Sequence, residues 1–217
     1  MDQLLALSPL DGRYLNKTDI LRPILSEYGL IKHRLMVEVY WFIALSKTPD
    51  IKQLPPVDKT TEEILLQLIE NFDLESAQQV KAHEATTNHD VKAVEYFIAD
   101  FFKKDKQLKK YINLIHYGLT SEDVNSLSYA IMINNGIKDY LEYFQNLNKI
   151  LKTLSSKWKS IPLLSRTHGQ AASPTTIGKE LKVFQLRISK EINTLKNIKP
   201  LAKFSGATGN YHTFEIT

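Results

Sequence analysis

The sequence has 217 residues, 43% of them hydrophobic and 24% charged, which is enough to bury a core in one or two domains. Eight Gly and eight Pro argue against a disordered or loop-rich chain, and the absence of Cys excludes a disulfide scaffold and a thiolate metal site. The net charge of +4 comes from lysines that are mixed with acids and not interleaved with stacking aromatics, so nucleic-acid binding is not predicted.

The chain starts with MDQLLALSPLDGRY, which does not have the features of a secretion signal. An acid stands where basic residues are expected, and the apolar stretch is very short. No apolar run elsewhere approaches the roughly 18–20 residues that span a bilayer. These features, with the absence of Cys, predict a cytoplasmic protein that does not enter a membrane.

Four helices are predicted in the first half of the chain. Apolar residues recur at helical spacing from Asp19 to Ser46, with Pro23 near the start, where a helix tolerates proline. Further helices are expected over residues 61–72, 74–85 and 91–102. The second starts with Thr60 and Glu63 at capping-box spacing, and either Asn88 or Asp90 is the expected cap of the fourth.

Two long helices are predicted in the second half. One runs from about Thr120 to Trp158, with a local bend expected at Gly136, and Pro162 ends it. After a polar loop, Ser173–Pro174 is the expected start of the other. Apolar residues recur along both at gaps of three and four, as in helices that pack along a seam, and no strand alternation is found. The predicted fold class is therefore all-α, with a bundle completed by other helices of this chain or of partner subunits.

Two polar segments of the first half are candidate anion sites. SPLDGRY (8–14) is explained structurally as a turn, and TTNHDVKAVEY (86–96) as a capped helix start. The functional alternative for the first segment is that its arginine and the neighbouring tyrosine bind a phosphate or carboxylate. For the second segment, it is that the helix start binds another anionic group. The residues concerned are Arg13, Tyr14, Asn88, His89 and Asp90.

Two further polar segments lie in the second half. In HYGLTSED (116–123), Thr120 and Ser121 either cap a helix or hold a second anionic group. In RTHGQ (166–170), His168 is either an ordinary loop histidine or a general acid or base, because histidine titrates near neutral pH.

Other chemistries find little support in the sequence. HExxH, P-loop, GxGxxG and GxSxG motifs are all absent. His83–Glu84 with His89–Asp90 is the best available metal-ligand set, and its spacing is not that of a known site. Neither a metal nor a cofactor is predicted.

Taken in order, the four polar segments closely resemble those of the adenylosuccinate lyases, within the fumarase/aspartase superfamily. The resemblance covers essentially the whole chain through SPLDGRY, EYGLIKHRLMVEVYW, TTNHDVKAVEYF, HYGLTSEDVNSLSYA, IPLLSRTHGQAASPTTIGKE and SGATGNY. THGQ alone indicates only the superfamily, whereas its combination with DGRY and TTNHDVKAVEY is specific. Ala85 and Ala171 depart from the expected pattern, which has Arg and Pro there, and neither position is predicted to take part in the chemistry.

The resemblance implies a β-elimination without a cofactor. Adenylosuccinate would give AMP and fumarate, and the succinylated aminoimidazole carboxamide ribotide would give its carboxamide ribotide and fumarate. By this resemblance His168 is the general acid that protonates the departing nitrogen. The matching substrate-binding residues are Arg13, Tyr14, Asn88, His89, Asp90, Thr120 and Ser121, with His116 nearby but outside the set.

The resemblance also implies an organisation. Residues 1–110 would be an amino-terminal helical domain and residues 111–217 the first part of a central bundle, in a protein that forms homotetramers. The family's proton-abstracting serine lies on a Ser-rich loop leading into Met–Pro–Lys, which these 217 residues do not contain. The 217-residue chain alone is therefore expected to show little or no turnover. The alternatives are a truncated relative that acts as a helical interaction or ligand-binding module, and another lyase of the superfamily.

Overall fold

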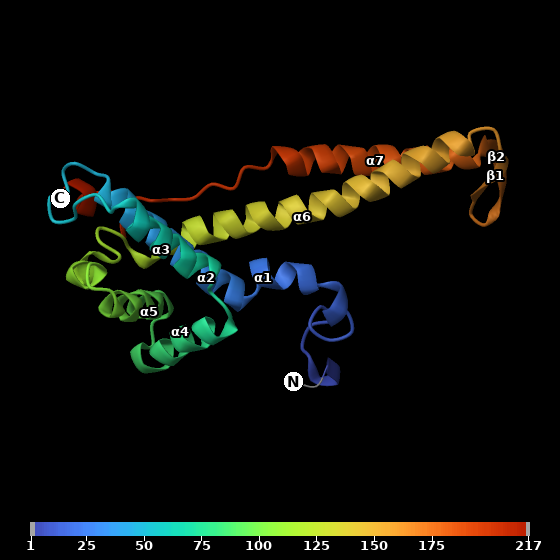
Figure 1. The fold of residues 1–217 in the computed structure, drawn as a ribbon. Helices are drawn as coiled ribbons and strands as arrows, with labels where there is room; N and C mark the ends of the chain where they lie inside the picture. The colour runs from blue at the N-terminus through green and yellow to red at the C-terminus, as the bar shows by residue number, and fades with distance from the viewer. Residues whose placement is uncertain (1–2, 216–217) are drawn as a thin grey trace. The chain divides into compact units, whose positions relative to one another are not determined.

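The computed structural model describes residues 3–215 and is built mainly of helices (Figure 1). Its longer elements follow the predicted order, and three 3₁₀ turns precede them at Gln3–Leu5, Leu15–Lys17 and Asp19–Leu21. The helices and strands are α1 (Arg22–Leu25), α2 (Glu27–Ser46), α3 (Lys59–Glu70), α4 (Leu74–Thr87), α5 (Asp90–Lys104), a 3₁₀ segment (Leu108–Leu114), α6 (Ser121–Lys157), β1 (Pro162–Thr167), β2 (Gln170–Thr176), α7 (Ile177–Asn197) and α8 (His212–Glu215).

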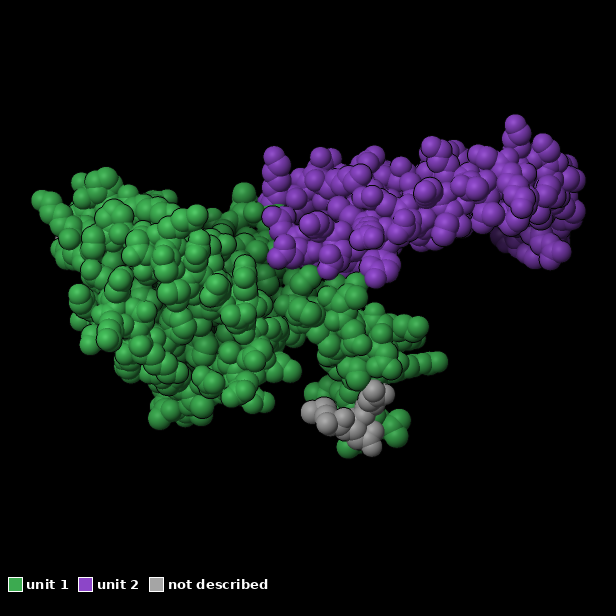
Figure 2. Space-filling view, viewed as in Figure 1, with its two compact units in different colours: residues 1–133, 200–217 green, residues 134–199 purple. Residues whose placement is uncertain are grey.

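The chain forms two compact units, each described by itself below (Figure 2). The first contains residues 1–133 and 200–217, and the second contains residues 134–199. The division falls within α6, which runs as one continuous helix through Gly136, and the local bend expected there stays a prediction. The proposed domain boundary at residue 110 stays a prediction.

The core of the first unit is built around α2. Most faces of this helix are buried, and its side chains pack against α3, α4 and α5. Phe42 meets Phe102 of α5 edge to face at 5.0 Å between ring centroids, and Phe72 meets Phe97 at 5.7 Å. Such aromatic pairs add to the burial of their apolar surface.

Residues after 199 return to the first unit through an aromatic cluster. The Trp41 ring of α2 lies 5.0 Å from that of Phe204 and 5.8 Å from that of Phe214, both edge to face. Residues 204–215 therefore pack on α2 through these rings, and they include the short helix α8, which was not predicted.

The predicted helix over residues 19–46 is interrupted at Ser26. Ser26 has an extended backbone, with ψ at 174°, and its hydroxyl accepts the Gly29 N–H at 3.2 Å to start α2. The chain folds back tightly at this point, since a Cβ on Gly29 would lie 2.4 Å from the carbonyl oxygen of Ile24. The helical spacing of apolar residues thus continues through Ser26, although the helix itself stops there and a new one starts with Ser26 as its cap.

Three predicted helix starts are also corrected. Asp58, not Thr60, caps α3 by accepting the Thr61 N–H at 2.7 Å. His89, not Asn88 or Asp90, caps α5, and Thr176 caps α7 in place of Ser173. In each case the side chain that reaches the free N–H two or three residues ahead decides the start.

The second unit contains a β-hairpin that was not predicted. Strands β1 and β2 pair antiparallel, from Pro162 opposite Thr176 to Thr167 opposite Gln170. The register shifts between Leu164 and Arg166, next to Pro174, which fits the confinement of proline to irregular strand positions. The all-α class is confirmed for the rest of the described chain, and this hairpin is the exception.

Helices α6 and α7 approach closely at the base of the hairpin. A Cβ on Gly178 would lie 2.3 Å from the Ser155 carbonyl oxygen, and the Gly178 N–H donates to the Trp158 carbonyl at 3.0 Å. Farther along, the Gln185 amide donates to Asn148 at 3.0 Å. Many apolar side chains of this unit are nevertheless exposed, including Tyr143 (59%), Ile150 (56%), Phe184 (56%) and Leu186 (55%).

Candidate active site

The junction of α4 and α5 holds three of the predicted substrate-binding residues. Asn88 adopts a left-handed conformation, with φ at 52°, and its N–H donates to the Glu84 carbonyl at 2.8 Å, which ends α4. Asparagine tolerates this conformation better than most residues. His89 then caps α5, because its Nδ1 accepts the Lys92 N–H at 3.2 Å. In the neutral ring the proton must therefore be on Nε2, and the half-exposed side chain offers an N–H donor to a ligand.

Asp90 is engaged within the protein. Its Oδ2 accepts from Nη2 of Arg34 at 2.5 Å, and its Oδ1 accepts the Val91 N–H at 2.9 Å. Burial opposes ionisation of this carboxyl, but the Arg34 charge and the Val91 N–H outweigh it and lower the pKa of Asp90. Because Asp90 and His89 already accept the N–H groups of Val91 and Lys92, these two backbone donors do not face a ligand at the α5 start.

The start of α6 contains the other predicted pair, Thr120 and Ser121. The Thr120 N–H donates to Oδ2 of Asp123 at 3.1 Å, which is one half of a capping box. The helix itself provides no partner for the N–H groups of Ser121 and Glu122, because they lie in its first turn. These N–H groups and the two hydroxyls can hold an anion at the positive end of the helix.

Asp123 fixes a returning segment to the α6 start. Its side chain is fully buried and accepts from Nζ of Lys203 at 2.6 Å, from the Ser205 N–H at 2.9 Å and from the Gly206 N–H at 3.2 Å. Burial raises the pKa of an acid, but the Lys203 ammonium and the N–H donors outweigh that effect and lower the pKa of Asp123. The SGATGN segment is thus tied to the same helix start as Thr120.

The loop before Thr120 is anchored by a buried ionic pair. His116 has φ at 61°, and its Nδ1 lies 2.5 Å from Oε1 of Glu38, whose side chain is 0% exposed. Burial raises the pKa of Glu38. Burial alone would lower the pKa of His116, but the hydrogen bond and charge of Glu38 outweigh it and raise that pKa. The Oε1 of Glu95, itself paired with Lys92, lies 3.9 Å from the same ring nitrogen.

The structure brings the α5 start and the α6 start together on α2. The buried Arg34 guanidinium donates to Asp90 and, through Nε, to Oδ1 of Asn125 at 2.8 Å. Apolar packing joins the same three helices, since Val37, Val91 and Val124 form one buried cluster. Asp90 at the α5 start and Asn125, one turn after Ser121, are therefore joined through a single side chain.

Arg13 and Tyr14 lie outside that cluster of contacts. Residues 8–14 form a tight turn in which the Tyr14 N–H donates to the Pro9 carbonyl at 2.9 Å. Both side chains are exposed, and the Arg13 guanidinium lies 5.8 Å from the centre of the Tyr14 ring. The predicted role of this pair in anion binding stays a prediction.

His168 is at the tip of the β-hairpin in the second unit. Thr167 pairs with Gln170, so His168 and Gly169 form a two-residue turn, with φ at 52° and 73°. Positive φ at both central residues is the signature of a type I′ turn, which matches the twist of the strands. The His168 side chain is exposed. The other candidate residues lie in the first unit.

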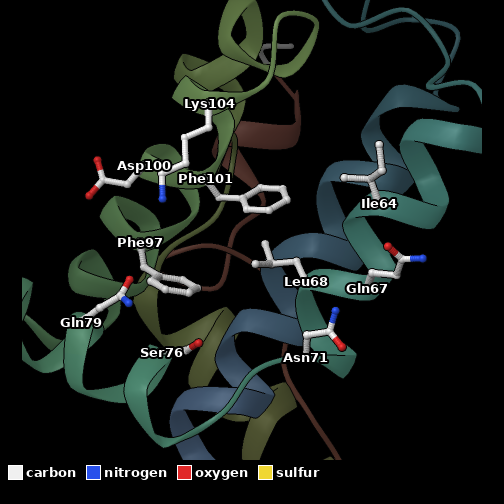
Figure 3. Close-up of a pocket in the computed structure, with 10 residues that line it drawn as sticks. All are labelled: Ile64, Gln67, Leu68, Asn71, Ser76, Gln79, Phe97, Asp100, Phe101 and Lys104. Carbon is white, nitrogen blue, oxygen red and sulfur yellow. The ribbon is translucent and has the colours of Figure 1, made fainter.

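A cavity of about 410 Å³ elsewhere in the first unit contains none of the candidate residues. Its wall combines Phe97, Phe101 and Lys104 of α5 with Gln67 of α3 and Gln79 of α4 (Figure 3). The acid in its lining, Asp100, is already paired with Lys103 at 2.7 Å and His83 at 2.9 Å. We therefore place the candidate site at the two helix starts.

Neither a metal site nor a membrane span is found in residues 3–215. No group of three His, Cys, Asp or Glu side chains there is arranged to hold a metal ion. None of the helices there combines the length and the apolarity needed to cross a bilayer.

The sequence analysis missed the buried charges that support the site. Arg34 and Glu38 lie four residues apart in the apolar helix sequence EYGLIKHRLMVEVYW, and both are buried. Charged residues are almost never buried unless paired, so two charges on the buried stripe of a helix are the signal that was available. Asp123 and Lys203 were not detectable as a pair, because 80 residues separate them.

Comparison with known proteins identifies the family. A family model described as Lyase matches residues 12–217. The chain belongs to this lyase family. It is 44% identical over 98% of its length to the adenylosuccinate lyase of Haemophilus influenzae, and 41% identical over its whole length to that of Dictyostelium discoideum. The adenylosuccinate lyase of Escherichia coli K12 is also 41% identical over 98% of the chain.

The chain spans about half the length of the curated relatives it matches, between 47% and 48% for these three. Solved structures share the fold at lower identity. A fumarate lyase from Mesorhizobium sp. BNC1 superposes with a TM-score of 0.71 at 19% identity, covering 90% of this chain and 44% of its own. A 3-carboxy-cis,cis-muconate lactonizing enzyme from Pseudomonas putida gives 0.73 at 18% identity, covering 90% and 43%.

Proposed function

We propose that this chain provides part of the active site of an adenylosuccinate lyase. The proposed reactions release fumarate from adenylosuccinate, giving AMP, and from the succinylated aminoimidazole carboxamide ribotide, giving its carboxamide ribotide. The observation that carries the proposal is the link between two helix starts through Arg34 of α2, which bonds both Asp90, next to His89, and Asn125, one turn after Ser121. Relatives that are 40–44% identical over nearly the whole chain are named adenylosuccinate lyase.

The proposed substrates match the donors of this junction. Each carries two carboxylates and a phosphate, and the junction provides an imidazole N–H, an amide, two hydroxyls and the first N–H groups of α6. Arg13 and Tyr14 are proposed to add a guanidinium and a phenol from the turn at residues 8–14. Asn88 and His89 are proposed to contact the substrate, and Asp90 to act through its bond to Arg34.

His168 is proposed as the general acid. In the elimination a base removes a proton from carbon, the electron pair forms the double bond of fumarate, and the carbon–nitrogen bond breaks. His168 donates a proton to the departing nitrogen, which becomes the amine of AMP. The imidazole is exposed at the two-residue turn of the β-hairpin, whose backbone conformation is fixed by the pairing of the two strands. By the family resemblance the base is a serine outside these 217 residues, so the chain alone is proposed to have little turnover, and no cofactor is required.

A homo-oligomeric, cytoplasmic enzyme is proposed. Unit 2 exposes apolar side chains such as Tyr143, Ile150 and Phe184 by more than half, and large exposed apolar surfaces commonly mark subunit interfaces. A tetramer whose central bundle pools α6 and α7 with helices of other subunits would cover them.

The test is the turnover of adenylosuccinate by the protein that carries this chain, followed as AMP release. We expect His168→Gln to lower kcat by about 10²–10⁴-fold, the usual contribution of a positioned general acid, with a small change in KM. His212→Gln is the matched control, because His212 is also exposed and lies outside the candidate site. Robust turnover by His168→Gln would refute the assigned acid, and a wild-type protein inactive on adenylosuccinate would refute the substrate.

A further inference from the structure

Three successive turns of α2 each hold a part of the candidate site. Arg34 holds the α5 and α6 starts, Glu38 one turn later holds His116, and Nε1 of Trp41 donates to the Tyr117 carbonyl at 2.8 Å. The donors proposed to bind the substrate lie on loops and helix ends, whereas these supports lie on one buried helix. Precise sites are those whose ligand-binding groups are supported from rigid elements in this way.

Arg34 is the support that touches both helix starts. Its side chain is only 6% exposed, although a buried guanidinium loses much of its hydration energy. Two directed bonds compensate for that loss, from Nη2 to Asp90 and from Nε to Asn125. Asn125 lies one helical turn after Ser121, so a single planar group links the Asn88–Asp90 junction with the Thr120–Ser121 pair.

We infer that Arg34 is a positioning residue that sets the spacing between the α5 start and the α6 start, and so between two anion-binding parts of the substrate site. The inference rests on the proposed function. By this inference Asp90 is a partner of Arg34 and does not contact the substrate, since both of its carboxylate oxygens already accept hydrogen bonds within the protein. His89 and Asn88 are then the substrate-facing groups of that junction.

Lysine cannot reproduce this arrangement. A guanidinium presents its N–H groups as a rigid planar fork, whereas an ammonium is a point charge on a flexible stem. Arg34→Lys therefore keeps the charge while it loses the fixed relation between Asp90 and Asn125. This makes it a sharper test than a neutral substitution, which would leave Asp90 without its cation.

The first measurement is the steady-state kinetics of adenylosuccinate cleavage by the protein that carries this chain. We expect Arg34→Lys to raise KM about tenfold, the effect of losing one charge-assisted hydrogen bond, and to change kcat by less than about threefold. A residue that only stabilises the fold would lower the active fraction, and hence the apparent kcat, without changing KM. Arg187→Lys, an exposed position on α7, is the matched control and should leave both constants unchanged.

A second variant tests the same link from the other side. Asn125→Ala removes only the acceptor of the Nε bond, and we expect a smaller rise in KM, about threefold, in a protein that folds. The double variant Arg34→Lys/Asn125→Ala should raise KM no further than Arg34→Lys alone, because both changes break one connection. Independent, multiplying effects on KM would overturn the inference.

A substrate-free measurement separates this inference from the proposed function. In amide hydrogen exchange, the segments 88–92 and 119–125 should together exchange about tenfold faster in Arg34→Lys than in the wild-type protein and in Arg187→Lys. A wild-type protein that does not cleave adenylosuccinate would refute the proposed function, and the exchange rates would still decide whether Arg34 links the two segments. If the wild-type protein is active, either of two results for Arg34→Lys would overturn the Arg34 inference: an unchanged KM, or faster exchange in only one of the two segments.

Discussion

The buried pair of Glu38 and His116 allows one quantitative prediction about the stability of the first unit. The perturbation is His116→Asn, which removes the imidazole and its charge. Asparagine is chosen because position 116 has φ at 61°, and asparagine accepts this left-handed conformation better than alanine. The change therefore tests the ionic contact and not the strain of the turn.

The magnitude follows from what the variant leaves behind. The Glu38 side chain is 0% exposed, His116 is 15% exposed, and Oε2 of Glu38 is already buried without a hydrogen-bond partner. Loss of His116 deprives the other oxygen of its partner as well. Removing one member of a buried ion pair costs about 3–5 kcal/mol, so we expect a loss near 3 kcal/mol at neutral pH, because the site is not completely closed to water. Adding Glu38→Gln should recover most of it, since a neutral amide does not leave a buried charge.

The predicted loss depends on pH with a defined sign. The pKa of His116 is raised in the folded state, so its stabilising contribution is fully present below the ordinary value of 6.5 and is lost as pH rises through the raised value. The pKa of Glu38 is raised above 4.5, so on acidification this carboxyl takes up a proton early, and the penalty for an unpaired charge disappears. The destabilisation by His116→Asn should therefore be largest near neutral pH and shrink on both sides.

The assay is urea unfolding followed by circular dichroism at about pH 5, 7 and 9, with the wild-type protein as the reference at each pH. His168→Asn is the matched control, because its backbone is also left-handed, at φ 52°, while its side chain is exposed. That control should change the free energy of unfolding by less than about 0.5 kcal/mol. A loss below about 1 kcal/mol for His116→Asn at pH 7, or a loss independent of pH, would refute the reasoning.

Three further changes should each lower the free energy of unfolding. Asp123→Asn should cost about 2 kcal/mol at pH 7 in urea unfolding, because it removes the charge paired with Lys203. The pKa of Asp123 is lowered in the folded state, so this advantage of the wild-type protein should disappear as pH falls below the ordinary value of 3.8 and through the lowered one. A cost that persists in acid would contradict the assignment. Thr176→Ala should cost about 1 kcal/mol in thermal unfolding through loss of the α7 cap, whereas Thr176→Ser should be nearly neutral, so equal costs would argue against the cap. Gly178→Ala should cost about 1–3 kcal/mol, because its Cβ would lie 2.3 Å from a backbone oxygen of α6, and a neutral result in thermal unfolding would show that the helices separate easily.

Helices were predictable from the sequence because their apolar spacing is a local property. The limits of α4, α5, α6 and α7 lie within a few residues of the predicted ones. The caps were less predictable, because neighbouring residues such as Asn88, His89 and Asp90 can each cap a helix, and tertiary contacts choose between them. Asp90 bonds to Arg34, and Asn88 adopts the left-handed conformation that ends α4. His89 is therefore the residue that accepts the Lys92 N–H and caps α5.

The hairpin was missed for a physical reason. Its strands are exposed on both faces, so they lack the alternation of apolar and polar residues that identifies a half-buried strand. Pro174 within the second strand also argued for a helix start. The available signal was His168–Gly169, two residues that tolerate positive φ between segments containing Thr, Ser and Gln.

The buried charges of α2 are better explained by the geometry of the site than by the stability of the helix. A helix that is buried on most faces would be at least as stable with apolar residues at positions 34 and 38, because buried ion pairs seldom repay the loss of hydration. Apolar residues would not provide directed hydrogen bonds that hold neighbouring segments in one orientation. Arg34 fixes the relation of Asp90 to Asn125, and Glu38 fixes His116 before the α6 start, so the loops that would bind the substrate are held in place before it arrives. A site that must bind several anionic groups at once gains from such preorganisation, since it does not have to order those loops during binding.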